Sequence, residues 1–387
     1  MRACLVKAVA MATMLGAAVA ANPSAGAADW EMVIVGPPDL QGPSAALDVS
    51  ADGATVVGTT DGAVFRWSEV AGVEILSPHD WLHTHTAGVS DDGTQIASTV
   101  YHASSGLYEP SRWTEGLGWE PLGGLPGQTP PEDAWGSGYD ISGDGSLVVG
   151  LGWHTDYRAE AFAWTQAAGM VGLGKPPNNS SRASAVSRDG HVVGGFYEHE
   201  TGGYRRPARW TDGGPVDLIV GPDDPGEVSG ISGDGSFLTG DWTPLGYDGP
   251  VAFLFSDAGG AIPILPVSPS PTHRTFGGAV SDSGVVVGWS GDQTGGAVEA
   301  GIWFPGDARM RSLSDWLTAR GVAIPAGWLL VSATGISPDG TAVVGQAFNT
   351  STSAYGAFII RMPEIILDSG FDFGGYEGWT DVVGLAR

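Results

Sequence analysis

Three histidines lie close together at His79, His83 and His85, and Asp80 stands between the first two. Neutral imidazole binds zinc and copper, and a His-x-His pair on an extended chain places both rings on one side. The spacing makes these three histidines candidate metal ligands. The simpler alternative, which we favour, is a chance grouping of polar residues in an exposed loop.

Aromatic residues recur in the polar segments between the apolar runs of the chain. Their rings can stack on the C–H faces of sugars while neighbouring acids and amides bond the hydroxyls, so saccharide or peptide binding is the functional interpretation. The alternative is that these rings only pack the loops onto the body of the protein. The candidate ligand-binding residues are Tyr101, Tyr108, Trp153, Tyr157, Tyr197, Tyr204, Trp242, Tyr247 and Trp289.

Motifs of common enzymes do not occur in the sequence. There is no Gly-x-Ser-x-Gly elbow, no His-Glu-x-x-His and no phosphate-binding loop, and paired acids such as Asp223-Asp224 sit in turn-like segments. We therefore expect a non-enzymatic binding or interaction module without a cofactor. The alternatives are a polysaccharide-active hydrolase or lyase, and a purely structural surface protein. A divalent cation is conceivable, but no ligand motif supports it.

The elements that position these residues are marked by seven copies of one phrase, Ser-x-Asp-Gly before a Val/Ile/Leu-rich run. Their glycines are Gly53, Gly93, Gly145, Gly190, Gly235, Gly284 and Gly340. A period near 45 residues with strand-like content is typical of a β-propeller. In the third copy we expect strands over 139–142, 146–150, 160–165 and 170–173, with positive φ at both Asp144 and Gly145.

The last unit lacks a fourth strand after residue 360, whereas Trp30-Glu-Met-Val-Ile-Val35 is a strand without a unit. We predict that this N-terminal strand completes the seventh blade and closes the ring, which removes open sheet edges. The fold prediction is an all-β, seven-bladed β-propeller. An open β-solenoid is the alternative. Loops between second and third strands, and between blades, share one face, where variable loops carry function by default.

The two ends of the chain are expected to serve other purposes. Arg2 and Lys7 precede a short apolar stretch, so residues 1–27 read as a signal peptide with cleavage after Ala20 or Ala27. The propeller is predicted over 28–363 and a short tail over 364–387. The only cysteine, Cys4, lies in the signal, so the mature chain contains no disulfide. We expect a bacterial protein that is secreted to the cell surface or outside the cell.

The chain is acidic, with 43 Asp and Glu residues against 17 Lys and Arg and a formal net charge of −26. Such a surface repels phosphate backbones, so nucleic acid is not an expected partner. No later apolar run is long enough to span a membrane. The expected partners are carbohydrate or protein, and we expect a monomer.

The repeated units resemble the HAF family of probable extracellular repeats. The resemblance rests on Ile-Ser-x-Asp-Gly-x-x-Val-Val-Gly at 141–150 and Ala-Phe-x-Trp at 161–164, and it covers about residues 45 to 362. It implies a secreted propeller-like protein and supplies no established activity. Gln95-Ile-Ala-Ser98, Phe255 and Ser283 depart from the pattern, so irregular blades are expected at the second, fifth and sixth units.

Overall fold

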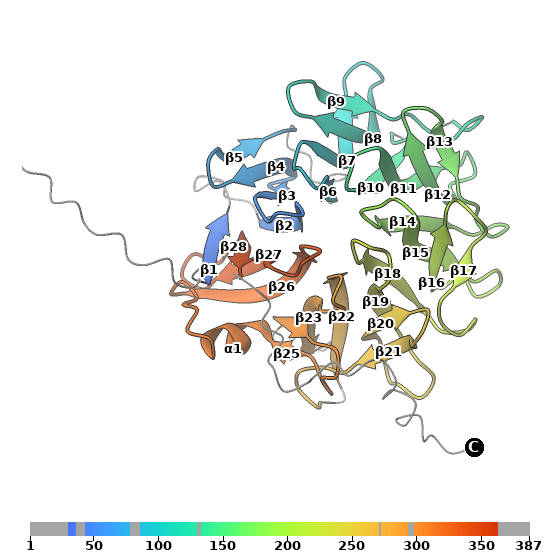
Figure 1. Cartoon of the computed structure of the whole chain (residues 1–387). Coiled ribbons are helices and arrows are strands. Elements are labelled where there is room, and N and C mark those ends of the chain that lie inside the picture. Colours follow the sequence, from blue (N-terminus) through green and yellow to red (C-terminus); the bar gives the residue numbers. More distant parts are fainter. Residues whose placement is uncertain are drawn as a thin grey trace, which may run out of the picture.

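Seven four-stranded antiparallel sheets stand in a ring around a central axis (Figure 1). The computed structural model describes residues 30–35, 43–77, 86–129, 133–270, 272–292 and 298–362. In each sheet the strands follow one another from the axis outward. The predicted seven-bladed β-propeller is therefore confirmed.

Each blade corresponds to one of the seven sequence units. Blades 1 to 3 comprise β2 (Ser44–Val49), β3 (Thr55–Thr60), β4 (Ala63–Ser68) and β5 (Gly72–Ile75); β6 (Ala87–Val89), β7 (Gln95–His102), β8 (Leu107–Thr114) and β9 (Gly118–Pro121); and β10 (Gly136–Ile141), β11 (Leu147–Trp153), β12 (Ala159–Thr165) and β13 (Gly169–Gly172). Blades 4 and 5 comprise β14 (Ser181–Val186), β15 (Val192–Glu198), β16 (Arg205–Thr211) and β17 (Asp217–Leu218); and β18 (Gly226–Ile231), β19 (Leu238–Trp242), β20 (Val251–Ser256) and β21 (Gly260–Ile264). Blades 6 and 7 comprise β22 (His273–Val280), β23 (Val286–Asp292), β24 (Val298–Trp303) and β25 (Arg311–Ser312); and β26 (Trp328–Ile336), β27 (Ala342–Asn349), β28 (Ala354–Arg361) and β1 (Glu31–Val35).

The N-terminal strand closes the ring as predicted. β1 pairs antiparallel with β28, with Val33 opposite Ile359 and Val35 opposite Ala357. Val35 is only 1% exposed and belongs to the core cluster that blade 7 shares with blade 1. The last blade is thus built from both ends of the described chain, and the ring has no open blade edge between its first and last units.

The repeated phrase forms the loop between the first and second strands of every blade. In six copies the serine hydroxyl donates to the aspartate at 2.6–2.8 Å, as Ser142 does to Asp144. The serine oxygen also accepts the backbone N–H at the start of the second strand, as Ser142 does from Leu147 at 3.0 Å. The seven glycines have φ between 69° and 77°, whereas the aspartates do not have positive φ. Our expectation of positive φ at both positions was therefore wrong, because the connection spans four residues and only its glycine is left-handed.

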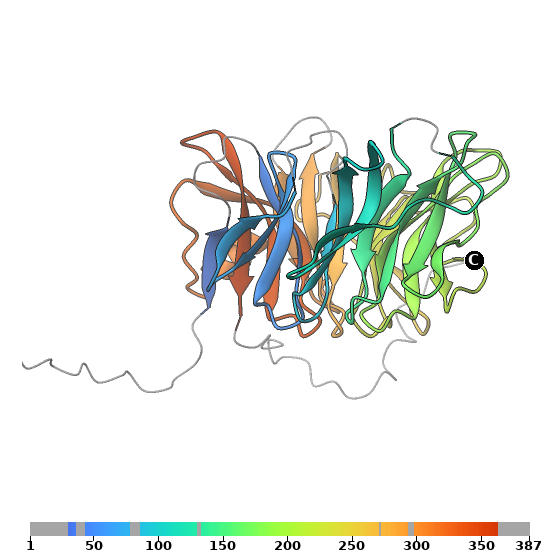
Figure 2. The same ribbon diagram turned by 90° about the horizontal axis from the view of Figure 1, so that it is seen from above.

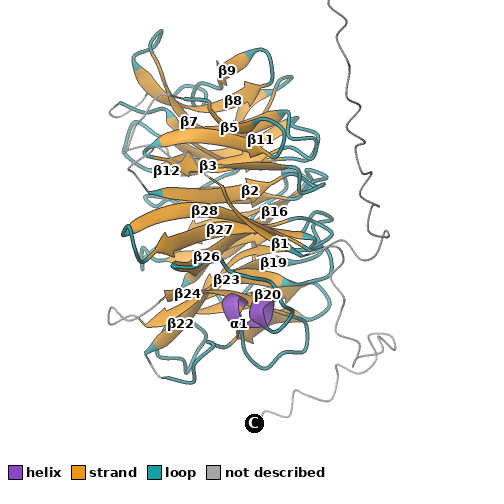
Figure 3. Cartoon of the chain, turned by 90° about the vertical axis from the view of Figure 1, so that its left-hand side faces the viewer, coloured by secondary structure: helices purple, strands orange, loops and turns teal. Residues whose placement is uncertain are grey.

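The expected irregular blades are four-stranded like the others. The difference at the sixth copy is local: Ser281 bonds Ser283 instead of an aspartate, and its N–H pairs with Val285, one residue earlier than in the other copies. A short helix not expected from the sequence, α1 (Leu313–Thr318), follows β25 at the rim (Figure 3). Its buried Leu313, Trp316 and Leu317 face the core between blades 6 and 7.

Arginine–aromatic stacking joins neighbouring blades. An arginine on the third strand of one blade lies over the aromatic ring at the same level of the next, as Arg66 does over Trp113 at 4.8 Å and Arg112 over Trp164 at 4.8 Å. Arg209 stacks likewise on Phe255. These third-strand rings are buried, so they pack between blades and are not available to a ligand.

The ring is a disc with two different faces (Figure 2). The Asp-Gly turns and the connections between third and fourth strands lie on one, which we call the Asp-Gly face. The loops between second and third strands, together with the blade-to-blade connections, lie on the opposite one, which we call the loop face. The topology of antiparallel blades requires this separation, as the sequence predicted.

Candidate functional site

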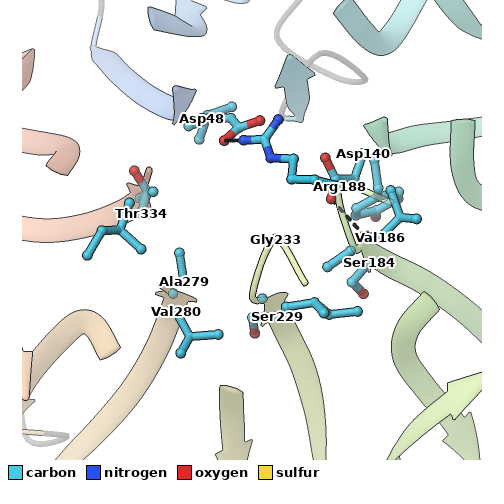
Figure 4. Close-up of a pocket in the computed structure, with 18 of the residues that line it drawn as sticks. Asp48, Asp140, Ser184, Val186, Arg188, Ser229, Gly233, Ala279, Val280 and Thr334 are labelled. Atoms are coloured by element: carbon cyan, nitrogen blue, oxygen red, sulfur yellow. Dashed lines mark hydrogen bonds and ion pairs between the residues drawn. The ribbon is translucent and has the colours of Figure 1, made fainter. Parts of the chain in front are cut away.

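The central channel contains a polar cavity of about 130 Å³, which first-strand residues of all seven blades line (Figure 4). Asp48, Asp140 and Arg188 are the charged groups on its wall. Asp48 and Asp140 hold the same place in their blades, two residues before the serine of the repeated phrase. The other five blades carry Gly or Ala there, so the cavity is walled mainly by small residues.

The two aspartates fasten adjacent blades to each other. Asp48 accepts the N–H of Val49 at 2.8 Å and, across the blade junction, that of Val89 at 2.9 Å. Asp140 accepts the N–H of Ile141 at 2.8 Å and that of Val186 in the next blade at 2.8 Å. Each carboxylate oxygen is therefore already bonded to the backbone, which suits a brace better than an acid or base.

Arg188 reaches across the channel from blade 4 to blades 1 and 2. Its guanidinium donates to the carbonyl oxygens of Val49, at 2.9 Å, and of Val89, and it lies 3.3 Å from Asp48 Oδ1. Burial, followed by the charge of Asp48, raises the pKa of Asp140 to about 7, although Arg188 opposes that rise. We did not identify Asp48, Asp140 and Arg188 from the sequence. The signal that could have revealed them is that both aspartates lie two residues before the repeated serine.

The channel wall near Arg188 is reinforced by backbone hydrogen bonds between the residues that follow the repeated serines. The N–H of Asp91 donates to Gly143, that of Gly143 to Arg188 and that of Arg188 to Gly233, at 2.8–3.0 Å. With its charged groups bonded in this way, the Asp-Gly end of the channel holds the ring together. The loop face is therefore the better candidate for ligand binding.

Tyrosines concentrate on the loop face. The chain has nine tyrosines, eight of them described, and seven of these flank or lie in the loops between second and third strands. Four of them are strongly exposed and come from four different blades: Tyr101 (45%), Tyr157 (60%), Tyr247 (40%) and Tyr355 (41%). Tyr355 was not among the sequence candidates, although its place after the last loop matches theirs.

The other candidates occupy several environments. Tyr108 packs against Tyr101 with ring centroids 5.3 Å apart, and Tyr204 stacks on His199 at 4.8 Å. Trp153 is the half-buried last residue of β11, and Tyr197 is half-buried near the end of β15 beneath the Arg206 guanidinium. Tyr108 and Trp153 belong to the hairpins that carry the exposed Tyr101 and Tyr157, whereas Tyr197 and Tyr204 belong to the hairpin of blade 4, which carries no strongly exposed tyrosine among the described residues.

Contrary to expectation, six of the nine candidates lie in strands and not in loops: Tyr101, Tyr108, Trp153, Tyr197, Trp242 and Trp289. Two of them pack against other rings within their sheets. Trp242 is 8% exposed at the end of β19 and stacks on Phe253 in the core of blade 5. Trp289 lies inside β23 and stacks on Phe276 with centroids 4.1 Å apart. Both second strands are longer than the sequence suggested, so these tryptophans pack within the sheet structure instead of projecting from a loop.

The candidate metal ligands His79, His83 and His85 lie outside the described residues, as do the segments predicted to be a signal peptide and a C-terminal tail. Within the described ranges, no group of three or more His, Cys, Asp or Glu side chains is arranged to hold a metal ion. The same part of the chain contains no helix that is long and apolar enough to cross a membrane.

Comparison with known proteins shows similarity in fold alone. No family model and no curated protein matches the sequence. Among solved structures, the oligogalacturonate lyase of Vibrio parahaemolyticus is similar with a TM-score of 0.53 and 11% identity, over 87% of this chain and 98% of that one. The β-propeller domain of the Trilobed protease from Pyrococcus furiosus, described as having an open velcro topology, has a TM-score of 0.53 and 12% identity over 85% and 98% of the two chains. The fold and these similarities define the class of protein, a seven-bladed β-propeller.

Proposed function

We propose that this protein is an exported, non-enzymatic binding module of the HAF-repeat kind that holds carbohydrate on its loop face. The observation that carries the proposal is the set of four exposed tyrosines, Tyr101, Tyr157, Tyr247 and Tyr355, which four separate blades present on one face. A tyrosine offers an apolar ring and a hydroxyl at little conformational cost, which suits a sugar.

The distribution of the rings favours an extended polymer. They stand on blades 2, 3, 5 and 7, so a chain lying across the disc can touch several in succession. Each contact is weak by itself, but contacts in series on one rigid scaffold add to useful affinity. The strongly acidic composition disfavours nucleic acid and supports a neutral or hydroxyl-rich ligand.

The channel supports a binding role over catalysis. Its two aspartates have both oxygens engaged by backbone N–H groups, and its arginine is bonded to fixed acceptors. A general acid and base need a proton-carrying group that faces the substrate. Asp140, whose pKa is raised to about 7, can carry a proton at neutral pH, but both of its oxygens are held by the backbone N–H groups of Ile141 and Val186.

The test is incubation of the mature chain with a panel of polysaccharides, measuring depletion of protein from solution together with release of reducing ends and unsaturated sugars. The combined variant Y101A/Y157A/Y247A/Y355A should weaken retention by on the order of 1,000-fold, since each of the four rings is worth about 1 kcal/mol. The matched control is V70A/L117A, which removes exposed apolar groups from the Asp-Gly face.

Depletion without products, lost in the tyrosine variant and kept in the control, is the expected result. Product release would instead establish a polysaccharide-active enzyme. The absence of both depletion and products across the panel would contradict carbohydrate binding and leave a protein partner or a structural role.

A further inference from the structure

A second cavity opens on the loop face at the junction of blades 5 and 6. Its volume is about 230 Å³, and it lies between the 246–249 loop of blade 5 and the start of β22. Val251, Leu265 and Pro266 form apolar wall, whereas Tyr247, Ser270 and His273 contribute polar atoms. It therefore combines an apolar surface with a few converging polar groups, which is the composition of a small-ligand site.

The wall of this cavity is held in a fixed shape by a buried arginine. Arg274 is 9% exposed, and its guanidinium donates to the carbonyl oxygens of His273 and Asp248, each at 2.9 Å. Gly249 lies so close that a side-chain carbon there would stand 2.0 Å from Arg274 Nε. The loop that carries Tyr247 and the strand that carries His273 are thereby joined through one side chain.

His273 is half-buried and lines this cavity. Its Nδ1 is buried and has no hydrogen-bond partner among the described residues. Because this atom is closed to solvent, the polar groups that can meet an occupant of the cavity are the rest of the half-buried His273 ring and the Ser270 hydroxyl. Tyr247, 40% exposed, stands at the same cavity with its ring available for stacking.

We infer that this cavity binds a single sugar ring, with Tyr247 and the apolar wall against its C–H face and with the Ser270 hydroxyl and the His273 ring beside its hydroxyls. The inference rests on the proposed function and names the subsite that selects the sugar. Drug-sized ligands occupy about 300 Å³ or more, so the smaller volume suits one ring better than an oligosaccharide. The bound unit is therefore a chain end or a branch.

The occupant is identified by hydroxyl chemistry and not by charge. The arginine at this cavity is engaged with backbone carbonyl oxygens, so an acidic group on the ligand is not required for recognition. Either tautomer of His273 can pair with a hydroxyl, because a hydroxyl both donates and accepts.

The experiment titrates the mature chain with methyl glycosides of glucose, galactose, mannose, xylose, N-acetylglucosamine, glucuronic acid and galacturonic acid. The histidine ring nitrogens are followed by nuclear magnetic resonance. At least one glycoside should shift the His273 signals, with a dissociation constant on the order of 1 mM, typical of a small weak ligand. H273A and Y247A should each weaken that binding by about tenfold. H191A, whose ring lies on the Asp-Gly face, should not.

The outcomes separate this inference from the proposed function. If polysaccharides retain the protein but none of the glycosides shifts His273, or if H273A and Y247A bind as the parent does, the subsite is wrong and the loop-face function stands. If the protein binds neither polysaccharides nor glycosides, both are wrong. A glycoside that shifts His273 in the parent and loses affinity in both variants supports the subsite.

Discussion

Deleting the closing strand β1 should remove much of the stability of the ring. Val35 is 1% exposed, and Val33 packs beside it between blades 7 and 1, while Trp30, Met32 and Ile34 pack on the core of blades 6 and 7. Counting about 2 kcal/mol for the buried valine and about 1 kcal/mol for each half-buried side chain gives roughly 6 kcal/mol. This estimate is comparable with the whole free energy of unfolding of a typical domain, about 5–15 kcal/mol.

Urea unfolding followed by tryptophan fluorescence measures this loss in a chain that lacks residues 30–35. Single variants show which side chains of the strand contribute to this stability. V35A should lower the free energy of unfolding by about 2 kcal/mol because it empties a buried site, whereas E31A, at an exposed position, should lower it by under about 0.5 kcal/mol. An unchanged unfolding midpoint for the deletion, or equal effects of V35A and E31A, would refute closure of the ring by this strand.

Three further predictions concern the channel arginine Arg188, the turn serine Ser142 and the buried carboxyl of Asp241. R188M should destabilise by about 3 kcal/mol or more, because it leaves Asp48 without its counter-charge, whereas R205M, at an exposed arginine, should cost under about 1 kcal/mol in the same urea assay. S142A should cost about 1–2 kcal/mol in that assay, since the buried hydroxyl both donates to Asp144 and accepts from Leu147; a neutral variant would show that the turn forms without it. Burial, followed by the charge of Glu227, raises the pKa of Asp241 from 3.8 to about 7, so the folded state keeps a proton that the unfolded state releases, and stability should fall as pH rises from about 4 to 7. D241N should therefore be more stable than the parent at pH 8 by about 4 kcal/mol and similar at pH 4, and parallel pH profiles of the two proteins would contradict this.

Much of the fold could be predicted from the sequence because its signals are local and repeated. The Asp-Gly turn, the apolar run after it and the aromatic residue ending the third strand recur in register, and they define where each blade begins. The N-terminal strand could be assigned to the seventh blade because one unit lacked a strand and one strand lacked a unit. The turn geometry could not be predicted in the same way, since Asp-Gly suits both a two-residue turn and the longer loop that is observed.

The site was harder to predict because it depends on strand length and on contacts between blades. Trp242 and Trp289 were expected in loops, but β19 and β23 extend far enough to include them. Helix α1 has its Leu313, Trp316 and Leu317 at helical spacing after the N-cap Ser312, yet six residues are too few for the pattern to stand out. The Asp48–Arg188 contact joins residues 140 positions apart, which no local pattern reveals.

The carbohydrate-binding claim for the loop face is tested most directly by hydrogen–deuterium exchange of the mature chain with and without the polysaccharide that retains it best. Protection should appear in segments 101–108, 153–158, 243–250 and 350–355, while the Asp-Gly turns exchange as before. Protection confined to the Asp-Gly face, or no change in the four loop segments when the polysaccharide is bound, would contradict binding on the loop face.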